Sequence, residues 1–292
     1  MNTLDKSMSI ADAVDLVRDG DTVLFGGWGA SRKPMAIVRE LVRSDLKELT
    51  IVTMGGLDAD FLIAAGKVQK VIYGFLGYHQ LPGIPGRCRQ SRRDGSVEMV
   101  ELSEGMFVLG LKAAAEGLPF LPTRSGLGTD ILTMSPNIKT IECPYTGTML
   151  VAVPAISADI AFLHVNAASI SGYGKIVGDA WLDRIMARAA KKTIISTERI
   201  VTLAEMKKDH PTIKISRLWI DGVIEAPYGA HPTSCFPDYG VDRVKLDEYT
   251  SASATSDSAD AYIDKYIRNI DSQVSYIDLM GGAARLSQIK YS

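Results

Sequence analysis

The 292-residue sequence is poor in cysteine and in metal-ligand spacing. It contains 3 cysteines, Cys88, Cys143 and Cys235, and none of them forms a CxxC pair. Few, widely spaced cysteines argue against a disulfide framework and fit a reducing cytoplasm. The 4 histidines do not combine with these cysteines into a zinc-ligand pattern either. We therefore expect a cytoplasmic protein without a bound metal.

An excess of charge of one sign and long apolar runs are also lacking. The 32 basic and 34 acidic residues give a net charge of −2, so no basic surface for nucleic acid or an anionic membrane is expected. No apolar run approaches the roughly 18 residues of a membrane span. Residues 1–14 lack the apolar core of a signal peptide. The sequence thus predicts neither nucleic acid nor membrane as a partner.

Two common catalytic signatures are missing. There is no G-x-S-x-G elbow, so a serine hydrolase of that kind is not indicated. The Gly-rich segment at residues 25–29 is neither G-x-G-x-x-G nor a P-loop, since no Gly-Lys-Ser/Thr follows it. What remains is a chain with 46% hydrophobic residues, enough for a sizeable core.

Strand-like and helix-like segments alternate along the chain, which predicts an α/β fold with a mostly parallel sheet and flanking helices. We expect one domain over residues 1–292. Ser9 is expected to cap a helix at residues 10–18, and a helix is also expected at residues 181–190. Residues 77–96 are rich in proline, glycine and arginine, which predicts a loop or a short irregular helix. The further expected segments are strands at residues 22–25, 49–54, 68–73, 158–165 and 192–197 and a helical C-terminal tail at about 258–292.

The stretch from residue 97 to residue 129 combines several features of a ligand site. A strand at residues 97–102 is expected to end in the corner Ser103-Glu104-Gly105, from which a helix begins. Gly117 and Pro119 end that helix. A second short strand then opens into a Gly-rich turn that starts at Arg124. Because ligands of α/β folds bind at the carboxyl ends of strands, we place the chemistry here.

Each charged candidate in this stretch has two interpretations. Glu104 is either a nucleophile or general base, or an acid that merely stabilises the start of its helix through the helix dipole. Arg124 either binds a carboxylate or phosphate of a ligand, or forms a structural ion pair.

Three further candidates lie outside the stretch. The glycine loop at residues 26–29 either lets backbone N–H groups approach an anion or an oxyanion, or is only a tight turn. His231, in the stiff loop Ala230-His231-Pro232, is either catalytic or a packed loop histidine. His164 ends a buried strand and is expected to be a hydrogen-bonded core histidine.

Several motifs in order make the chain resemble the α subunit of family I coenzyme A transferases, most closely the glutaconate CoA-transferase type. The resemblance covers nearly the whole chain. It rests on the helical C-terminus and on the motifs Gly26-Gly27-Trp28-Gly29, Arg32-Lys33-Pro34, Leu118-Pro119-Phe120-Leu121-Pro122 and Glu225-Ala226-Pro227-Tyr228-Gly229-Ala230-His231-Pro232.

The resemblance implies an open α/β/α sandwich and a homologous β subunit, usually in an α₂β₂ heterotetramer. It implies a coenzyme A thioester as substrate and no other cofactor. In ordinary members the nucleophilic glutamate belongs to the β subunit, whereas the α subunit supplies part of the acyl-group pocket and a Gly-rich loop beside the thioester. The substrate-binding positions expected on this basis are Gly26, Gly27, Trp28, Gly29, Arg32, Ser103, Gly126 and His231.

One departure from the family pattern concerns the reaction. Where glutaconate-type α subunits have Ser-Gln, this chain has Ser103-Glu104. In this it is similar to a second branch of the family, hydrolases that open the last steroid ring of a CoA thioester in bacterial cholesterol and bile-acid catabolism. This resemblance implies that Glu104 is the acid/base, with Arg124 as an electrophilic or carboxylate-binding partner. Two alternatives stay open, a CoA-transferase acting on a dicarboxylic or 3-oxo acid and a non-catalytic subunit that shapes the active site of the β subunit.

Overall fold

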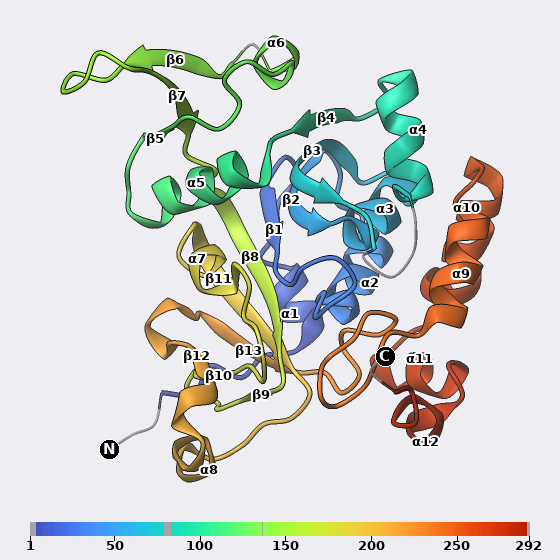
Figure 1. Cartoon of the computed structure of the whole chain (residues 1–292). Helices are drawn as coiled ribbons and strands as arrows, with labels where there is room; N and C mark the ends of the chain where they lie inside the picture. Colours follow the sequence, from blue (N-terminus) through green and yellow to red (C-terminus); the bar gives the residue numbers. More distant parts are fainter. Residues whose placement is uncertain (1–3, 79–82, 136, 291–292) are drawn as a thin grey trace.

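The computed structural model describes residues 4–78, 83–135 and 137–290 (Figure 1). Its centre is a seven-stranded sheet in the order β13-β11-β8-β1-β2-β3-β4, and every neighbouring pair is parallel. The predicted α/β fold is thereby confirmed. The strands are β1 (Thr22–Phe25), β2 (Leu49–Gly55), β3 (Val68–Leu76), β4 (Glu98–Glu101), β8 (Ala158–Val165), β11 (Ala190–Thr197) and β13 (Gly222–Glu225).

Helices cover both faces of this sheet, which confirms the expected sandwich. On one face lie α1 (Ile10–Val14), α2 (Met35–Arg43) and α3 (Leu57–Ala64), whose buried side chains share one core with the C-terminal helices. On the other face, α5 (Glu104–Ala115) and α7 (Asp183–Met186) contribute to a second core (Figure 1). The sheet is therefore buried on both sides, as parallel sheets usually are.

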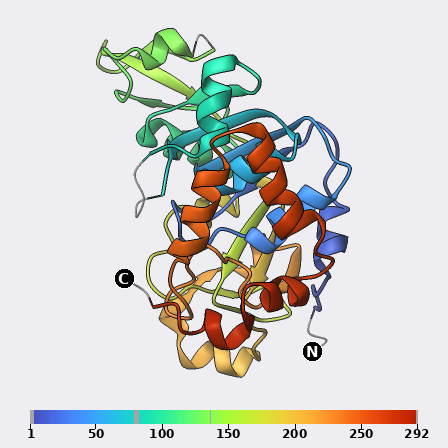
Figure 2. The ribbon, with the colours of Figure 1, turned by 90° about the vertical axis from the view of Figure 1, so that its right-hand side faces the viewer.

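The helical C-terminal segment packs on the chain itself (Figure 2). Tyr262 and Ile267 of this segment are buried in the core that α2 and α3 share. The segment begins earlier than the expected residue 258, because residues 243–252 also form a helix. Its helices are α9 (Arg243–Ala252), α10 (Ser256–Ile263), the π-helical turn η3 (Asp264–Arg268), α11 (Gln273–Leu279) and α12 (Gly282–Leu286).

A small antiparallel sheet projects from the top of the molecule in Figure 1. It contains β5 (Phe120–Thr123), β6 (Lys139–Glu142) and β7 (Met149–Pro154) and carries the short helix α6 (Ile131–Met134). A third sheet, below, consists of β9 (Ala167–Ala168), β10 (Gly174–Lys175) and β12 (Ile213–Ile215). The remaining elements are α4 (Gly86–Asp94), α8 (Leu203–Lys208), η1 (His210–Thr212) and η2 (Arg217–Trp219).

Three local expectations need correction. The helix predicted at residues 181–190 is only the single turn α7, because pairing with β8 draws the chain into β11 from Ala190 onward. Within residues 77–96 the structure has a regular helix, α4, while residues 79–82 lie outside the described residues. Ser9 caps α1 as expected, in a capping box with Asp12, but α1 ends at Val14. Within the described ranges, no helix is long and apolar enough to cross a membrane.

A fully buried ion pair joins the loop after β1 to the start of α3. The Nζ atom of Lys33 lies 3.0 Å from Oδ2 of Asp58 and donates to Oγ1 of Thr53 at 2.8 Å. The side chains of both charged residues are 0% exposed. Burying such a pair is costly, but losing one partner is worse because the other charge is left unpaired in the interior.

We therefore expect Lys33→Met to destabilise the chain by about 3–5 kcal/mol, since it leaves Asp58 buried and unpaired. Equilibrium urea unfolding measures the change. Lys191→Met is the matched control, because Lys191 pairs with Asp159 on the surface and is 77% exposed. Equal effects of the two substitutions would contradict this account.

Candidate active site

Parallel pairing of the central strands brings their carboxyl ends to one edge of the sheet. From β1 the chain continues to β2 on one side, whereas the neighbouring β8 continues to β11 on the other. This is a topological switch point, where open α/β sheets bind their ligands. The loops after β1, β3, β4 and β8 all open at this edge.

The corner between β4 and α5 is joined to the Gly-rich turn by two serines. Ser103 is the N-cap of α5 and accepts a hydrogen bond from the N–H of Met106 at 3.2 Å. The Oγ atoms of Ser103 and Ser125 are 2.7 Å apart, within hydrogen-bond distance. The structure thus brings together the predicted corner, which carries Glu104, and the predicted turn, which begins at Arg124.

Gly126 allows that turn to lie directly on α5. Its φ is +91°, a backbone conformation that glycine adopts easily. A Cβ atom at this position would lie 2.9 Å from the Sδ atom of Met106. Gly126 therefore sets the close approach of turn and helix, and the structure gives it a packing role.

Glu104 and Arg124 are both exposed beside this contact. Within the part of the chain that the structure describes, neither side chain forms a hydrogen bond or an ion pair. The structural ion pair that was the alternative for Arg124 is therefore not seen there. A carboxylate and a guanidinium are left available at the carboxyl edge of the sheet.

A cavity of about 710 Å³ follows β4, the strand that leads to this corner. Tyr73 of β3, Arg92 of α4 and Glu101 of β4 line it, together with Asp130 beyond the Gly-rich turn. Arg92 and Glu101 form an ion pair of 2.8 Å. This volume lies in the range of pockets that hold small-molecule ligands.

The glycine loop after β1 uses its own backbone donors. The N–H groups of residues 26–29 donate to Phe162 O, Asp183 Oδ1, Ser31 O and Met54 O at 2.8–3.0 Å. A Cβ atom on Gly27 would lie 2.3 Å from Ser31 O, so the turn needs glycine for packing. Internal acceptors engage the N–H groups of Gly26, Gly27, Trp28 and Gly29, which favours the tight-turn alternative; their role as substrate-binding positions stays a prediction.

Arg32 is engaged in the same way. Its side chain is 4% exposed and forms a buried ion pair with Asp183 of α7. It also donates to the backbone oxygen of Asp179 at 2.9 Å. The charge of Arg32 is therefore neutralised within the chain, and its observed role is to hold the β1 loop against α7. Asp183 was missed because an acid inside a predicted amphipathic helix ordinarily faces solvent.

Trp28 is held between two other aromatic rings. Its ring centroid lies 5.5 Å from that of Phe75 and 4.7 Å from that of Trp181, with interplanar angles of 20° and 24°. The stack runs from the carboxyl end of β3 to the segment before α7. Of the predicted binding residues at the β1 loop, Trp28 has the clearest connection to an exposed surface, because Trp181 is 44% exposed.

His231 is buried on the face of the sheet that α5 does not cover. Its Nδ1 atom lies 2.8 Å from the hydroxyl of Tyr276 in α11, and Nε2 lies 3.0 Å from Oδ2 of Asp242. Arg39 of α2 donates to its backbone oxygen at 2.9 Å. Because the Asp242 carboxylate only accepts, Nε2 carries the proton and Nδ1 accepts from Tyr276. The structure does not bring His231 to the Glu104 corner, and it supports the packed-histidine interpretation.

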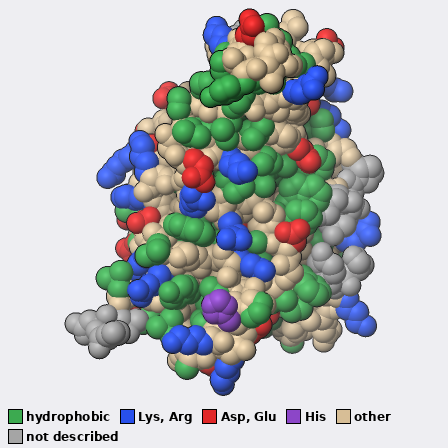
Figure 3. Space-filling view, turned by 60° about the vertical axis from the view of Figure 1, so that its left-hand side comes forward, with side chains coloured by type: hydrophobic (Ala, Val, Ile, Leu, Met, Phe, Trp, Pro, Cys, Tyr) green, Lys and Arg blue, Asp and Glu red, His purple; other side chains and the backbone are tan. Residues whose placement is uncertain are grey.

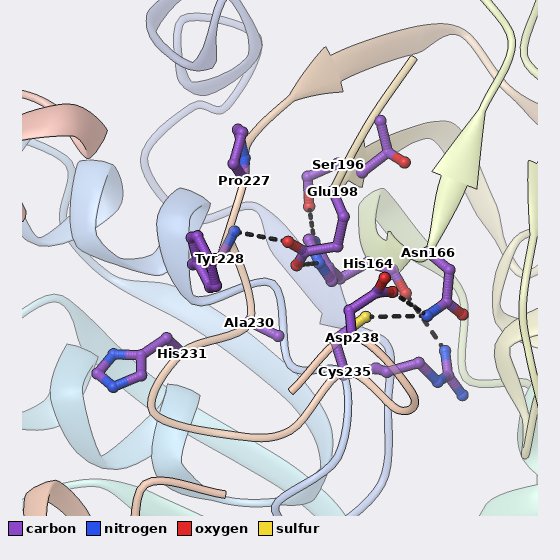
Figure 4. A network of polar contacts seen from close by, with 12 residues as sticks. His164, Asn166, Ser196, Glu198, Pro227, Tyr228, Ala230, His231, Cys235 and Asp238 are labelled. Carbon is purple, nitrogen blue, oxygen red and sulfur yellow. Dashed lines mark hydrogen bonds and ion pairs between the residues drawn. The ribbon is translucent and has the colours of Figure 1, made fainter. Parts of the chain in front are cut away.

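His164 is the hydrogen-bonded core histidine that the sequence predicted (Figure 4). Its ring nitrogens contact Ser196 Oγ at 2.9 Å and Glu198 Oε1 at 2.6 Å. With Cys235, His164 and Glu198 form the only group of possible metal ligands found among the described residues. The histidine and the carboxylate already bond to each other, and Glu198 also accepts from Tyr239 at 2.6 Å. The expected absence of a metal stays a prediction.

The fold and the edge site place the chain in the class of α/β proteins that bind ligands at the carboxyl edge of a parallel sheet. A family model described as Coenzyme A transferase matches residues 7–226. The chain belongs to the coenzyme A transferase family, as its motifs predicted, and is an enzyme subunit of that family.

Two relatives and one solved structure are similar over almost the full length. The cholesterol ring-cleaving hydrolase IpdA subunit of Mycobacterium tuberculosis is 37% identical over 290 residues, which cover 96% of this chain and 99% of that protein. One subunit of the glutaconate CoA-transferase of Acidaminococcus fermentans is 32% identical over 306 residues, covering 98% and 95%. The crystal structure of glutaconate coenzyme A-transferase from the same organism matches with a TM-score of 0.91 at 31% identity, covering 98% of this chain and 96% of that one. Both relatives are named as subunits, which implies a partner subunit for this chain.

The buried His231 makes stability depend on pH. Burial lowers the pKa of His231 below its ordinary 6.5, against the opposing effect of its hydrogen bond to Asp242. Below about pH 6.5 the unfolded chain therefore binds more protons than the folded chain, and stability falls as pH decreases. For Asp242, burial acts to raise the pKa, but the hydrogen bonds from His231 and Arg285 outweigh it and lower the pKa. Its contribution is thus lost only as pH falls below about 4.

We expect wild-type stability to decrease between pH 6.5 and pH 5, with a slope from this group of at most about 1.4 kcal/mol per pH unit. His231→Gln should flatten this decrease, because glutamine does not titrate. Urea unfolding at several pH values measures both slopes. Equal slopes in the wild type and the variant would contradict the assignment of the effect to His231.

Proposed function

We propose that this chain is the α subunit of an acyl-CoA enzyme that opens a steroid-derived cyclic keto acyl-CoA by hydrolytic carbon–carbon cleavage, in cholesterol or bile-acid catabolism. The observation that carries the proposal is Glu104, an exposed carboxylate with no partner among the described residues, at a strand-to-helix corner of the carboxyl edge. The similarity to a subunit named cholesterol ring-cleaving hydrolase supports it over nearly the full length of both chains.

Glu104 acts as general base and then as general acid. The carboxylate takes a proton from a water molecule while the water oxygen bonds to the carbon of the ring ketone. The resulting alkoxide collapses to a carboxylic acid, and the bond between that carbon and its ring neighbour breaks. The electron pair of that bond moves onto the neighbour, where a second carbonyl group attached to the neighbour holds it as an enolate, and the protonated Glu104 returns the proton to the neighbour. One water is consumed, and Glu104 ends in its starting state.

Arg124 stabilises the negative charge that develops during this sequence. The alkoxide and the enolate both need a donor that is already in place when the charge forms. A guanidinium is always charged and offers two parallel N–H donors to an oxygen pair. The Ser103–Ser125 contact holds the turn that carries Arg124 against the corner that carries Glu104. The cavity along β4 is the space that we assign to the acyl group.

Replacing the carboxylate should affect the chemical step rather than binding. We expect Glu104→Gln, in the enzyme assembled with its partner subunit, to lower kcat for a ring-ketone acyl-CoA by about 10²–10⁴-fold with little change in KM. Steady-state kinetics of ring opening measures this. The matched control is Glu116→Gln at the other end of α5, where Glu116 pairs with Arg188 on the surface. Unchanged kcat in Glu104→Gln would sink the proposal and favour a subunit that only shapes its partner's active site.

A CoA-transferase is the second candidate, and the match to the glutaconate enzyme with a TM-score of 0.91 favours it. In that case a glutamate of the partner subunit is the nucleophile, and CoA moves from an acyl-CoA donor to a dicarboxylic or 3-oxo acid. The two reactions separate on one test. Inactivation by hydroxylamine that requires acyl-CoA indicates the acyl-enzyme of a transferase, whereas no such inactivation is expected of the ring-opening hydrolase.

We further propose that the partner is a homologous β subunit in an α₂β₂ heterotetramer that covers the projecting sheet. This sheet exposes Phe120 of β5 (39%) and Met149 of β7 (50%), with Leu118 beside them (43%). Figure 3 shows hydrophobic side chains gathered on this face from the projecting sheet downward. Exposed apolar surface of this kind is typical of protein interfaces.

We expect the double substitution Phe120→Asp and Met149→Asp to prevent co-elution of the two subunits, because it places charge where apolar surface is buried. Size-exclusion chromatography of the co-expressed subunits measures the assembly. Val274→Asp on α11 is the control, since Val274 is 68% exposed on a helix of the C-terminal segment, outside the projecting sheet. Normal assembly of the double variant would show that the interface lies elsewhere.

A further inference from the structure

A second pocket opens at the switch point between β1 and β8, away from the Glu104 corner. Its volume is about 240 Å³. Three loops form it, the one after β1, the one that leads into α7 and the one after β13. The lining side chains used below are Ser31, Arg32, Asp179, Trp181, Ser234 and Phe236. We name it the Trp181 pocket.

The apolar lining of the Trp181 pocket includes two aromatic rings. Trp181 is 44% exposed and Phe236 is 42% exposed, which is unusual for side chains of this size. One face of Trp181 rests on Trp28, at 4.7 Å between centroids, so its position is fixed. Large rigid aromatic surfaces that stay exposed at a pocket are typical of sites that bind another ring.

Backbone strain is concentrated at the same pocket. Trp181 and Arg32 have φ values of +46° and +51°, a region that bulky L-residues rarely adopt. Such conformations are unfavourable and cluster at binding and catalytic sites, where the surrounding structure imposes them. Here the N–H of Trp181 donates to Oδ1 of Asp179 at 2.8 Å, and the Arg32–Asp183 ion pair holds the other strained residue.

The floor of the pocket is polar, and among the described residues that line it no cation is free to bind an anion. Asp183 neutralises Arg32, whose guanidinium also donates to the backbone of Asp179. The Oγ atom of Ser234 donates to Ala30 O and to Ser31 Oγ, both at 3.3 Å, which leaves the Ser31 O–H as the donor for the edge of a ligand. These features suit an uncharged ring with polar edge atoms rather than a phosphate.

From these observations we infer that the Trp181 pocket binds one ring of the acyl-CoA substrate, against Trp181 and Phe236. Its volume is below the roughly 300 Å³ of pockets that hold whole drug-sized ligands, so it accepts a part of the substrate. The ring has two possible sources in one molecule, the adenine base of coenzyme A and a ring of the acyl group. This inference rests on the proposed acyl-CoA function.

The aromatic stack extends from this pocket to the carboxyl end of β3. Phe75, at the far end of the stack, follows Gly74, where a Cβ atom would lie 2.9 Å from Phe107, one turn into α5. The N–H of Leu102, just before the corner, donates to Tyr73 O at 2.9 Å. The β3 end of the stack is therefore next to the strand residue that packs on the first turn of α5.

Binding is measured by isothermal titration calorimetry on the complex with the partner subunit, with Glu104→Gln as the parent so that no turnover occurs. Two probes separate the sources of the ring. Adenosine 3′,5′-bisphosphate carries only the nucleotide end, and a pantetheine thioester of a ring-bearing acid carries only the acyl end. Adding Trp181→Ala to this parent should weaken the binding of one of these probes by about tenfold or more, which is the usual effect of losing a stacking contact.

Trp181→Phe keeps a flat aromatic ring, so its affinity for that probe should fall by less than about threefold. Phe236→Leu keeps apolar volume but has no flat face, so it should weaken binding of the same probe that Trp181→Ala affects. Trp219→Phe, a tryptophan outside the pocket, is the control and should change neither probe. Melting curves of each complex exclude a loss caused by misfolding, and Phe236→Leu decides the question if Trp181→Ala does not assemble.

The inference is overturned if Trp181→Ala and Phe236→Leu bind both probes as tightly as the parent, or if the parent binds neither. Weaker binding of the nucleotide probe alone identifies adenine as the occupant of the pocket. Weaker binding of the thioester probe alone identifies the acyl ring. Failure of the proposed function has a different signature. In that case the enzyme with Glu104 intact binds the ring-ketone acyl-CoA in a Trp181-dependent manner but does not open the ring.

Discussion

Parallel pairing of all seven central strands is the constraint on which the candidate site depends. It brings the loops after β1, β3, β4 and β8 to one edge, although they come from distant parts of the chain. Two interactions then fix what these loops carry. The Ser103–Ser125 contact joins the acidic corner to the turn of Arg124, and the buried Arg32–Asp183 pair joins the β1 loop to α7. The Ser103–Ser125 contact leaves the charged side chains of Glu104 and Arg124 exposed, whereas in the Arg32–Asp183 ion pair the two charges neutralise each other.

The difference between these two interactions explains why two charged residues at the same edge of the sheet, Glu104 and Arg32, have different roles. Glu104 follows an edge strand of the sheet, where helix α5 begins and solvent reaches its side chain. Arg32 follows a central strand, where covering elements bury it and an acid must neutralise it. A charged residue at the edge can therefore act on a substrate, while the one at the centre stabilises the protein. The exposed aromatic surface of Trp181 is held on the central side, by stacking on Trp28 of the β1 loop.

Much of the fold could be predicted from the sequence, because β8 and β1 read as short buried apolar strands between helical segments. The corner could also be located, since strand, cap and helix are local patterns. The prediction of a helix at residues 181–190 was wrong, because the pairing of β11 with β8 is a tertiary effect that overrides the local pattern at Ala190. The hydrogen-bond acceptors of the glycine-loop N–H groups could not be predicted from the sequence either, since one of them, Asp183, lies 156 residues away along the chain. Long-range partners of this kind leave no spacing signal in the sequence.

We propose an acyl-CoA enzyme in which a carboxylate of this chain activates water, on a fold shared with enzymes that transfer coenzyme A. The two chemistries differ in where the new carboxylate obtains its oxygen. The most direct measurement is the reaction of a ring-ketone acyl-CoA in H₂¹⁸O, followed by mass spectrometry of the product. Hydrolytic ring opening predicts a product with the ring cleaved and one ¹⁸O atom in the new carboxylate. An intact ring, with coenzyme A moved to an acceptor acid, would contradict the account.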